Sequence, residues 1–191
     1  MPTLDYIVTP VAASAHRFRV VLQTEVEAGA PVELALPSWI PGSYVIRDFA
    51  RHLLSIAAES DGEPIEIISL DRQRWRCTPT GTRLTVACEF YARDESVRAA
   101  FLDDTRAFFN FTSLALRPAG REHDPCRVTL EAPTSIDNWQ AVTTLPAEAV
   151  DSRGFGVYAV ESYWSLIDQP VAMGAAVEYV RFEVRGVPHA F

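Results

Sequence analysis

The sequence contains no lysine, and all 17 of its basic residues are arginine. Acidic residues number 25, so the formal net charge of the 191-residue chain is −8. A nucleic-acid-binding protein needs a basic stripe to neutralise phosphates, and this balance argues against a nucleic-acid partner. The arginine bias mainly reflects genome composition, although arginine also suits planar pairing with carboxylates better than lysine does.

Cysteine is scarce as well. Cys77, Cys88 and Cys126 are far apart, odd in number and without CxxC spacing, which predicts a reduced protein with free or buried thiols. The first ten residues lack the basic start and apolar core of a secretory signal. No apolar run approaches the roughly 20 residues that span a bilayer. We therefore expect a cytoplasmic protein with no membrane partner.

The common catalytic motifs are also missing. A metallopeptidase helix places two histidines at i and i+4 with a glutamate between them, and no HExxH occurs here. The four histidines, His16, His52, His123 and His189, are far apart in the sequence, so we expect no metal site within this chain. There is no GxSxG nucleophile elbow, and the lone GxG at 154–156 indicates a turn rather than a phosphate loop.

What the sequence does contain is alternation of apolar and polar residues, in runs that recur about every ten residues. This pattern predicts one domain over residues 1–191, an all-β fold built as an antiparallel β-sandwich with at most short helical turns. One such turn is expected over Ser162–Asp168, with Ser162 as N-cap and Pro170 ending it. The expected strands are Leu4–Val8, His16–Val26, Val32–Leu36, Leu53–Ala58, Ile65–Leu70, Arg74–Cys77, Arg83–Tyr91, Thr112–Leu116, Cys126–Ala132, Asn138–Thr144, a short strand reaching Tyr158, and Val177–Val184.

One stretch, LPSWIPGSYVIRDFARH at Leu36–His52, is too rigid and too aromatic for a plain connector. Pro37 and Pro41 restrict the backbone on either side of Trp39. The residue types favour a buried loop that closes one end of the sandwich, with Arg47, Asp48 and Arg51 pairing at the surface. A functional site is the alternative reading of the same residues.

A second stretch gathers charge and aromatic rings around Asp103 and Asp104. Neighbouring carboxylates can hold an ammonium group or a cation. Residues Arg98, Arg106, Phe101, Phe108 and Phe109 surround the pair in the sequence. A solvated loop fixed by aromatics is the simpler reading, and a site that binds the amino group of a substrate is the sharper one.

Three segments together carry a family resemblance. They are LPSWIPGSYVIRDFARH, LDRQRW at 70–75, and YARDESVRAAFLDDTRAFFNFTSLAL at 91–116. The chain resembles, over nearly its whole length, the N-terminal region of glycyl-aminopeptidase-like zinc metallopeptidases, which are gluzincins with a PDZ domain near the C-terminus. Shorter matches follow at HDPCRVTL (123–130), Trp139, Gly154-Phe155-Gly156, LIDQPVAMG (166–174) and GVPH (186–189).

The resemblance implies a β-rich, saddle-like N-terminal domain without catalytic residues of its own. Zinc, the HExxH helix and the PDZ domain would belong to the full-length parent, beyond Phe191, and this chain alone would be inactive. Its partners would be the catalytic domain of the same polypeptide and, in the full-length enzyme, a peptide substrate. Phe111 departs from the family pattern, which has glycine in FFN-x-TS, and this puts close backbone approach there in doubt.

By analogy with the aminopeptidase relatives, the segment at 101–110 would line the substrate cleft. Asp103 and Asp104 would anchor the α-ammonium group, and Arg106 and Asn110 would orient them. The earlier stretch would be structural, with Trp39, Tyr44, Arg47, Asp48 and Arg51 supporting the face toward the catalytic domain.

Two other functions fit the residues. The chain could be a free-standing β-sandwich module that grips peptide or carbohydrate with Trp39, Trp139 or Trp164. It could also be a small enzyme built on Asp103, Asp104 and His52. An accessory domain separated from its partner would expose an apolar patch and tend to self-associate, whereas a binding module would stay monomeric.

Overall fold

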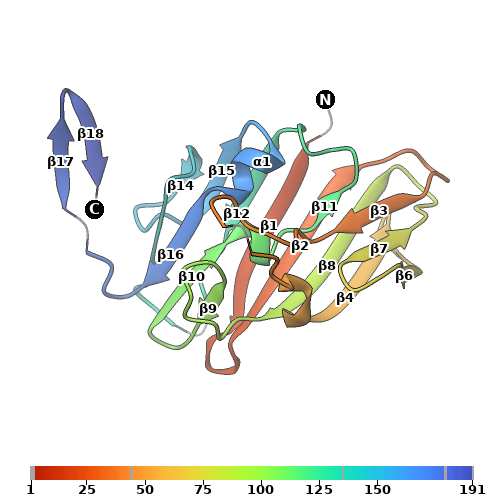
Figure 1. Cartoon of the computed structure of the whole chain (residues 1–191), viewed down its shortest axis with the longest axis horizontal. Coiled ribbons are helices and arrows are strands. Elements are labelled where there is room, and N and C mark those ends of the chain that lie inside the picture. The colour runs from red at the N-terminus through yellow and green to blue at the C-terminus, as the bar shows by residue number, and fades with distance from the viewer. Residues whose placement is uncertain (1–2, 44, 135, 179, 191) are drawn as a thin grey trace.

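The computed structural model describes residues 3–43, 45–134, 136–178 and 180–190. It is a β-sandwich in which one large sheet is covered by two small ones (Figure 1). The large sheet has eight strands in the order β14 (Ala147–Val150), β15 (Gly156–Val160), β12 (Cys126–Leu130), β1 (Leu4–Ala12), β2 (Arg17–Glu25), β8 (Arg83–Tyr91), β4 (Leu53–Ser60) and β5 (Glu63–Ile65).

The two covering sheets have four strands each. One runs β13 (Gln140–Thr143), β16 (Pro170–Gly174), β10 (Arg106–Asn110) and β9 (Ala100–Leu102). The other runs β11 (Arg117–Pro118), β3 (Val32–Ala35), β7 (Arg74–Cys77) and β6 (Ile67–Ser69). The predicted all-β sandwich is confirmed.

The buried side chains of the central strands form the core. Every second residue of β1, β2 and β8 is buried, because successive side chains of a strand point to opposite faces. These residues pack with side chains of both small sheets in one cluster. Its members include Leu4, Tyr6, Val8, Phe18, Val20, Leu22, Leu34, Trp75, Leu84, Val86, Phe90, Phe109, Val171 and Met173.

The sheet is not antiparallel throughout. β1 pairs with β12 in parallel, from Leu4 opposite Cys126 to Val8 opposite Leu130. A parallel pair needs a long connection, and here most of the chain separates the two strands. β1 also continues beyond the expected end at Val8, with a register shift between Pro10 and Ala12.

The strand predicted at Thr112–Leu116 is wrong. A 3-10 turn, η3 (Phe111–Ser113), begins there, and the chain then crosses the core as an irregular buried segment. The Tyr163 hydroxyl donates to the Ala115 carbonyl at 2.9 Å, and the Tyr6 hydroxyl donates to the Leu116 carbonyl at 2.8 Å. These bonds satisfy backbone acceptors that no strand ladder reaches.

Phe111, which occupies the position where glycine was expected, is a core residue. Its side chain is fully buried and meets the Phe109 ring edge to face, with ring centroids 5.3 Å apart. An edge-to-face arrangement is a favourable geometry for two aromatic rings. The position therefore holds a large ring in the core of this domain.

The short helix α1 (Tyr163–Ile167) confirms the predicted helical turn. The Ser162 hydroxyl accepts a hydrogen bond from the Ser165 amide at 3.1 Å, which is the expected N-cap. Pro170 does more than follow the helix, because it begins β16, a strand that the sequence pattern did not indicate.

The three cysteines are free and buried, as predicted. Burial raises the pKa of Cys88 and of Cys126 to about 12, so both thiols stay protonated at neutral pH. No helix in the described part of the chain is long and apolar enough to cross a membrane.

A hairpin of β17 (Arg181–Val184) and β18 (Val187–Ala190) extends away from the sandwich (Figure 1). These two strands pair with each other and with no other described strand. The predicted strand at Val177–Val184 therefore begins only at Arg181.

Candidate functional site

Asp103 and Asp104 lie in the turn that joins β9 to β10. One carboxylate oxygen of Asp103 accepts three hydrogen bonds, from the Thr105 amide at 2.8 Å, the Thr105 hydroxyl at 2.7 Å and the Arg106 amide at 2.9 Å. Slight burial opposes ionisation, but these bonds outweigh it and hold the pKa of Asp103 below its usual value. Asp103 therefore builds the turn, while Asp104 beside it is exposed.

Arg106 and Asn110 contact a neighbouring loop, residues 93–99. The Arg106 guanidinium lies 5.0 Å from the centre of the Phe101 ring and 3.6 Å from the Glu95 carboxylate. Asn110 is buried, and its side-chain amide donates to the Val97 carbonyl at 2.6 Å. The orientation of Asp103 thus comes from Thr105 and the Arg106 backbone, and the Asn110 side chain fastens the loop.

The stretch 36–52 folds into a loop followed by the 3-10 turn η2 (Phe49–His52). The Arg47 amide donates to the Ser38 carbonyl at 2.5 Å, which closes the loop, and Phe49 is buried beneath it. Tyr44 was also predicted to support this face, and it lies outside the described residues.

The two predicted stretches meet around one pocket of about 260 Å³, which we call the arginine pocket. It is formed by the loop ending in η2 and by the loop 93–99. Its lining residues are Val45, Ile46, Arg47, Asp48, Phe49, Arg51, His52, Asp94, Arg98 and Ala99. Sequence reasoning did not connect Asp94 with this site, and the only hint was the charged run Arg93-Asp94-Glu95.

Arg51 links the two loops that form the pocket. Its Nε donates to His52 Nε2 at 2.9 Å, and its Nη2 lies 3.6 Å from the Asp94 carboxylate. Because His52 Nε2 is an acceptor, the imidazole is neutral in this geometry. Burial, and then the Arg51 charge, lower the pKa of His52, which agrees with that state.

The pocket carries a local excess of positive charge. It is lined by three guanidinium groups and two carboxylates, with a neutral histidine, in a chain whose net charge is −8. The Arg47 Nε is buried and has no hydrogen-bond partner among the described residues. An acceptor with negative charge would complement the site.

Apolar side chains project around the pocket. Ile46 is 83% exposed, Val97 69% and Val45 60%. Single exposed aliphatic residues are common, but three around one charged pocket form a surface suited to contact with another protein surface.

The residues proposed for a small enzyme, His52, Asp103 and Asp104, do not line one common pocket. His52 lines the arginine pocket, whereas Asp103 and Asp104 are absent from its described lining. Asp103 is also occupied by the turn, so the three residues do not converge on one reacting position.

The tryptophans proposed for a binding module divide into two groups. Trp139 is fully buried, so its predicted part in surface binding is wrong. Trp39 and Trp164 are 48% and 41% exposed, and both line a pocket of about 180 Å³. The Arg117 guanidinium lies 5.8 Å from the centre of the Trp164 ring in the same pocket.

The described residues do not fit a zinc ion. Structural and catalytic zinc sites need three or more His, Cys, Asp or Glu ligands close together. Within residues 3–43, 45–134, 136–178 and 180–190, no such group occurs.

Comparison with known proteins identifies the family of this chain. The model of the peptidase M61 N-terminal domain matches residues 5–175. The chain is similar to the solved structure of an aminopeptidase N family protein from Idiomarina loihiensis, with 35% identity and a TM-score of 0.94 over 98% of this chain and 32% of that chain. It is less similar to an M1 zinc metallopeptidase from Deinococcus radiodurans, with 13% identity and a TM-score of 0.49 over 95% of this chain and 44% of that one.

No curated protein matches the sequence. The chain spans about one third of the length of the Idiomarina protein, as the 32% coverage shows. Because the family model covers far more than half of the sequence, this chain belongs to the family of peptidase M61 N-terminal domains.

Proposed function

We propose that this chain is the non-catalytic N-terminal domain of a zinc-dependent aminopeptidase and that it packs on the catalytic domain of the same polypeptide. The family match and the name of the Idiomarina relative support an aminopeptidase context. The zinc ligands would come from the catalytic domain, since the described residues here gather no ligand group.

The proposed docking on the catalytic domain rests on one observation, the exposed apolar rim of the arginine pocket. Ile46 is the most exposed large apolar side chain of the described residues, and Val97 and Val45 lie on the same pair of loops. Burying one such side chain contributes about 1.5–3 kcal/mol. A domain interface covering this rim would recover that free energy, with the charged pocket setting the register.

The turn between β9 and β10 is our candidate for the part that faces the substrate cleft. Asp103 fixes the turn through three hydrogen bonds, which leaves the exposed carboxylate of Asp104 available. A carboxylate on a rigid turn would complement the α-ammonium group of a peptide substrate. Loop 93–99 contacts both ends of β10, through Glu95 at Arg106, which follows the turn, and through Val97 at Asn110.

Docking is tested in the polypeptide that carries this domain together with its catalytic domain. Backbone hydrogen exchange at residues 45–52 and 94–99 should be slower there than in the isolated chain. Ile46→Asp should speed that exchange by about tenfold or more, because a charge would be buried in the interface.

The matched control is Val150→Asp. Val150 is 39% exposed on β14, at one edge of the large sheet, whereas β4, which directly follows the loop 36–52, lies beside the other edge strand, β5. It should leave exchange at both loops unchanged. Equal exchange in the isolated chain and the longer polypeptide would mean that this face is not an interface.

The pocket between Trp39 and Trp164 favours a second candidate function, binding of peptide or carbohydrate. Two partly exposed indole rings beside a guanidinium form a surface on which such ligands stack. Tryptophan fluorescence of the isolated chain, titrated with short peptides and oligosaccharides, should change if this pocket binds them, and an unchanged signal would argue against this function.

A further inference from the structure

We propose that the arginine pocket receives the carboxylate of an Asp or Glu side chain from the adjoining catalytic domain, which pairs with Arg47 and Arg98. The inference rests on the proposed docking and deepens it by naming the chemistry of the partner at its centre.

The first support is charge. Three arginines line the pocket against Asp48 and Asp94, in a protein that is otherwise strongly acidic. Asp94 is also shared, because one of its oxygens accepts from the Ser96 amide at 2.9 Å while the other faces Arg51 at 3.6 Å. The resident carboxylates therefore leave one positive charge uncompensated, and an incoming carboxylate would balance it.

The second support is the unmatched hydrogen-bonding capacity of Arg47. Its Nε is buried but has no acceptor among the described residues. A buried donor without a partner is unfavourable, and a guanidinium fork binds a carboxylate with two parallel hydrogen bonds. The bond that closes its own loop uses the Arg47 backbone amide and leaves the guanidinium out of that contact.

The third support separates a protein side chain from a free anion. Ile46 and Val97 stand exposed on the two loops that form the pocket. A small anion would leave both of them in water. A protein surface that carries a carboxylate would cover the apolar rim and bring its charge to the pocket in one step.

The absence of lysine makes a specific chemical test practicable. In the full polypeptide, Arg47→Lys introduces the one lysine side chain of this domain. A carbodiimide joins an amine to a carboxylate that it touches, with loss of water, and mass spectrometry then identifies both residues. We expect the peptide containing position 47 to be linked to an Asp or Glu outside residues 1–191.

Arg19→Lys is the matched control. Arg19 is exposed on β2, on the face of the large sheet opposite the core, and it is not one of the described residues that line the pocket. It should give no link to the same partner residue. In the parent protein, Arg98→Glu should abolish the protection of residues 45–52 and 94–99, and Arg19→Glu should not.

The outcomes separate the inference from the docking itself. If position 47 links only to Asp48 or Asp94, or to nothing, while the exchange experiment shows docking, the carboxylate partner is wrong and the docking stands. If the exchange experiment shows no docking, the proposed function fails, and the inference fails with it. A link to a catalytic-domain carboxylate together with the Arg98→Glu effect supports both.

Discussion

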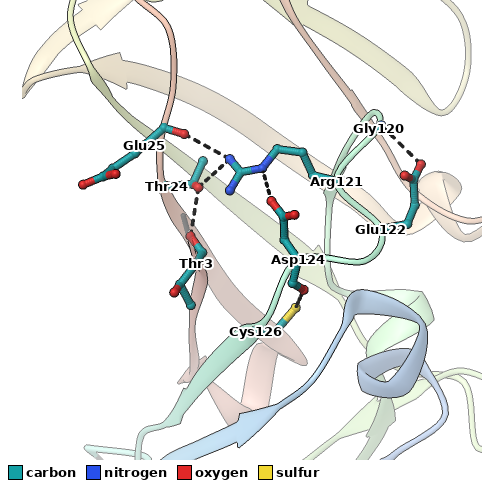
Figure 2. A network of polar contacts seen from close by, with 8 residues as sticks. All are labelled: Thr3, Thr24, Glu25, Gly120, Arg121, Glu122, Asp124 and Cys126. Atoms are coloured by element: carbon teal, nitrogen blue, oxygen red, sulfur yellow. Dashed lines mark hydrogen bonds and ion pairs between the residues drawn. The ribbon is translucent and has the colours of Figure 1, made fainter. Parts of the chain in front are cut away.

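Buried and half-buried polar side chains among the described residues differ in whether their hydrogen-bonding groups find partners. Arg121 is the matched case: its Nε donates to Asp124 at 2.5 Å, and its Nη1 donates to the Thr24 hydroxyl at 2.7 Å and the Glu25 carbonyl at 3.0 Å (Figure 2). The Thr24 hydroxyl in turn donates to the Thr3 carbonyl at 2.9 Å. This network joins the loop after β11 to the end of β2 and to the chain just before β1.

Thr112 is the unmatched case, and it gives a prediction. Its side chain is fully buried, and its hydroxyl has no partner among the described residues. Thr112→Val should leave stability unchanged or raise it by about 1 kcal/mol, because an unpaired polar group is replaced by an apolar group of the same shape. Differential scanning calorimetry should show a Tm equal to or up to about 4 °C above the parent.

Thr24→Val is the control for that substitution. Thr24 is also buried, at 5% exposure, but its hydroxyl both donates and accepts in the network of Figure 2. Its loss should lower stability by about 1–3 kcal/mol, since the Thr3 carbonyl and Arg121 each lose a partner. If both valine variants changed the Tm equally, the contrast between matched and unmatched hydroxyls would be wrong.

The local sequence indicated which residues of the loop 36–52 carry charge, but it did not indicate which ion pairs they form. Arg47, Asp48 and Arg51 were expected to pair with one another at the surface. In the structure, the Arg51 ion pair is with Asp94, a residue from a distant part of the chain. Periodicity reports which face a residue occupies, and it contains no information about long-range partners.

At the scale of elements, strands with one buried face were predictable, whereas the structure of a fully buried segment was not. β1, β2 and β8 alternate strictly, and all three were predicted. Residues 111–116 are all buried, so no alternation exists there to show whether the segment is a strand. β14 shows the opposite limit, because all four of its residues are exposed and no buried face marks the strand.

The turn between β9 and β10 gives a prediction in which neighbouring carboxylates behave differently. Asp103→Ala should lower stability by about 1 kcal/mol, because it removes the acceptor of the three hydrogen bonds that shape the turn. Asp104→Ala should change stability by less than about 0.5 kcal/mol, as expected for an exposed residue. Urea unfolding of the isolated chain measures both.

The pH dependence of the Asp103 effect has a defined sign. The folded-state pKa of Asp103 lies below its ordinary value, so its contribution to stability is present at neutral pH and is lost as the pH falls through that folded pKa. The difference between the parent and Asp103→Ala should therefore shrink below a pH of about 4. A difference that stayed constant with pH would show that the carboxylate charge has no part in the turn.

The same pair tests the proposed cleft role when it is placed in the full-length enzyme. Asp104→Asn keeps the shape of the side chain and removes its charge, so kcat/KM for substrates with a free amino terminus should fall by about tenfold or more if the carboxylate meets the α-ammonium group. An unchanged kcat/KM would remove Asp104 from the cleft.

For the molecule as a whole, composition and alternation were enough to predict the class of fold but not its assembly. The division into one large sheet and two small covering sheets depends on which strands pair, and strand patterns look alike whichever neighbour they have. The parallel pairing of β1 with β12 and the meeting of two distant stretches at the arginine pocket both arise at this level. The residues that resemble the metallopeptidases identified the family that the comparisons then showed.

The hairpin of β17 and β18 is the part of the molecule that contributes least to the core. Every residue of Arg181–Val184 is exposed, and the buried cluster ends with Met173. Cross-strand pairing places Phe182 and His189 together and Val184 and Val187 together, so the apolar side chains share one face. The family model also ends before the hairpin, at residue 175.

Removing residues 176–191 should therefore leave the sandwich intact. A two-stranded hairpin adds little stability by itself, and we expect the Tm to change by less than about 4 °C.

The apolar face of the hairpin, with Phe182 at 48% and Val187 at 55% exposure, should make the 191-residue chain self-associate at high concentration. Sedimentation equilibrium should find the shortened chain monomeric, and Phe182→Ser should weaken association without changing the Tm. Loss of the cooperative unfolding transition on truncation would instead make the hairpin part of the folding unit, and association that persisted after truncation would move the self-association surface to the rim of the arginine pocket.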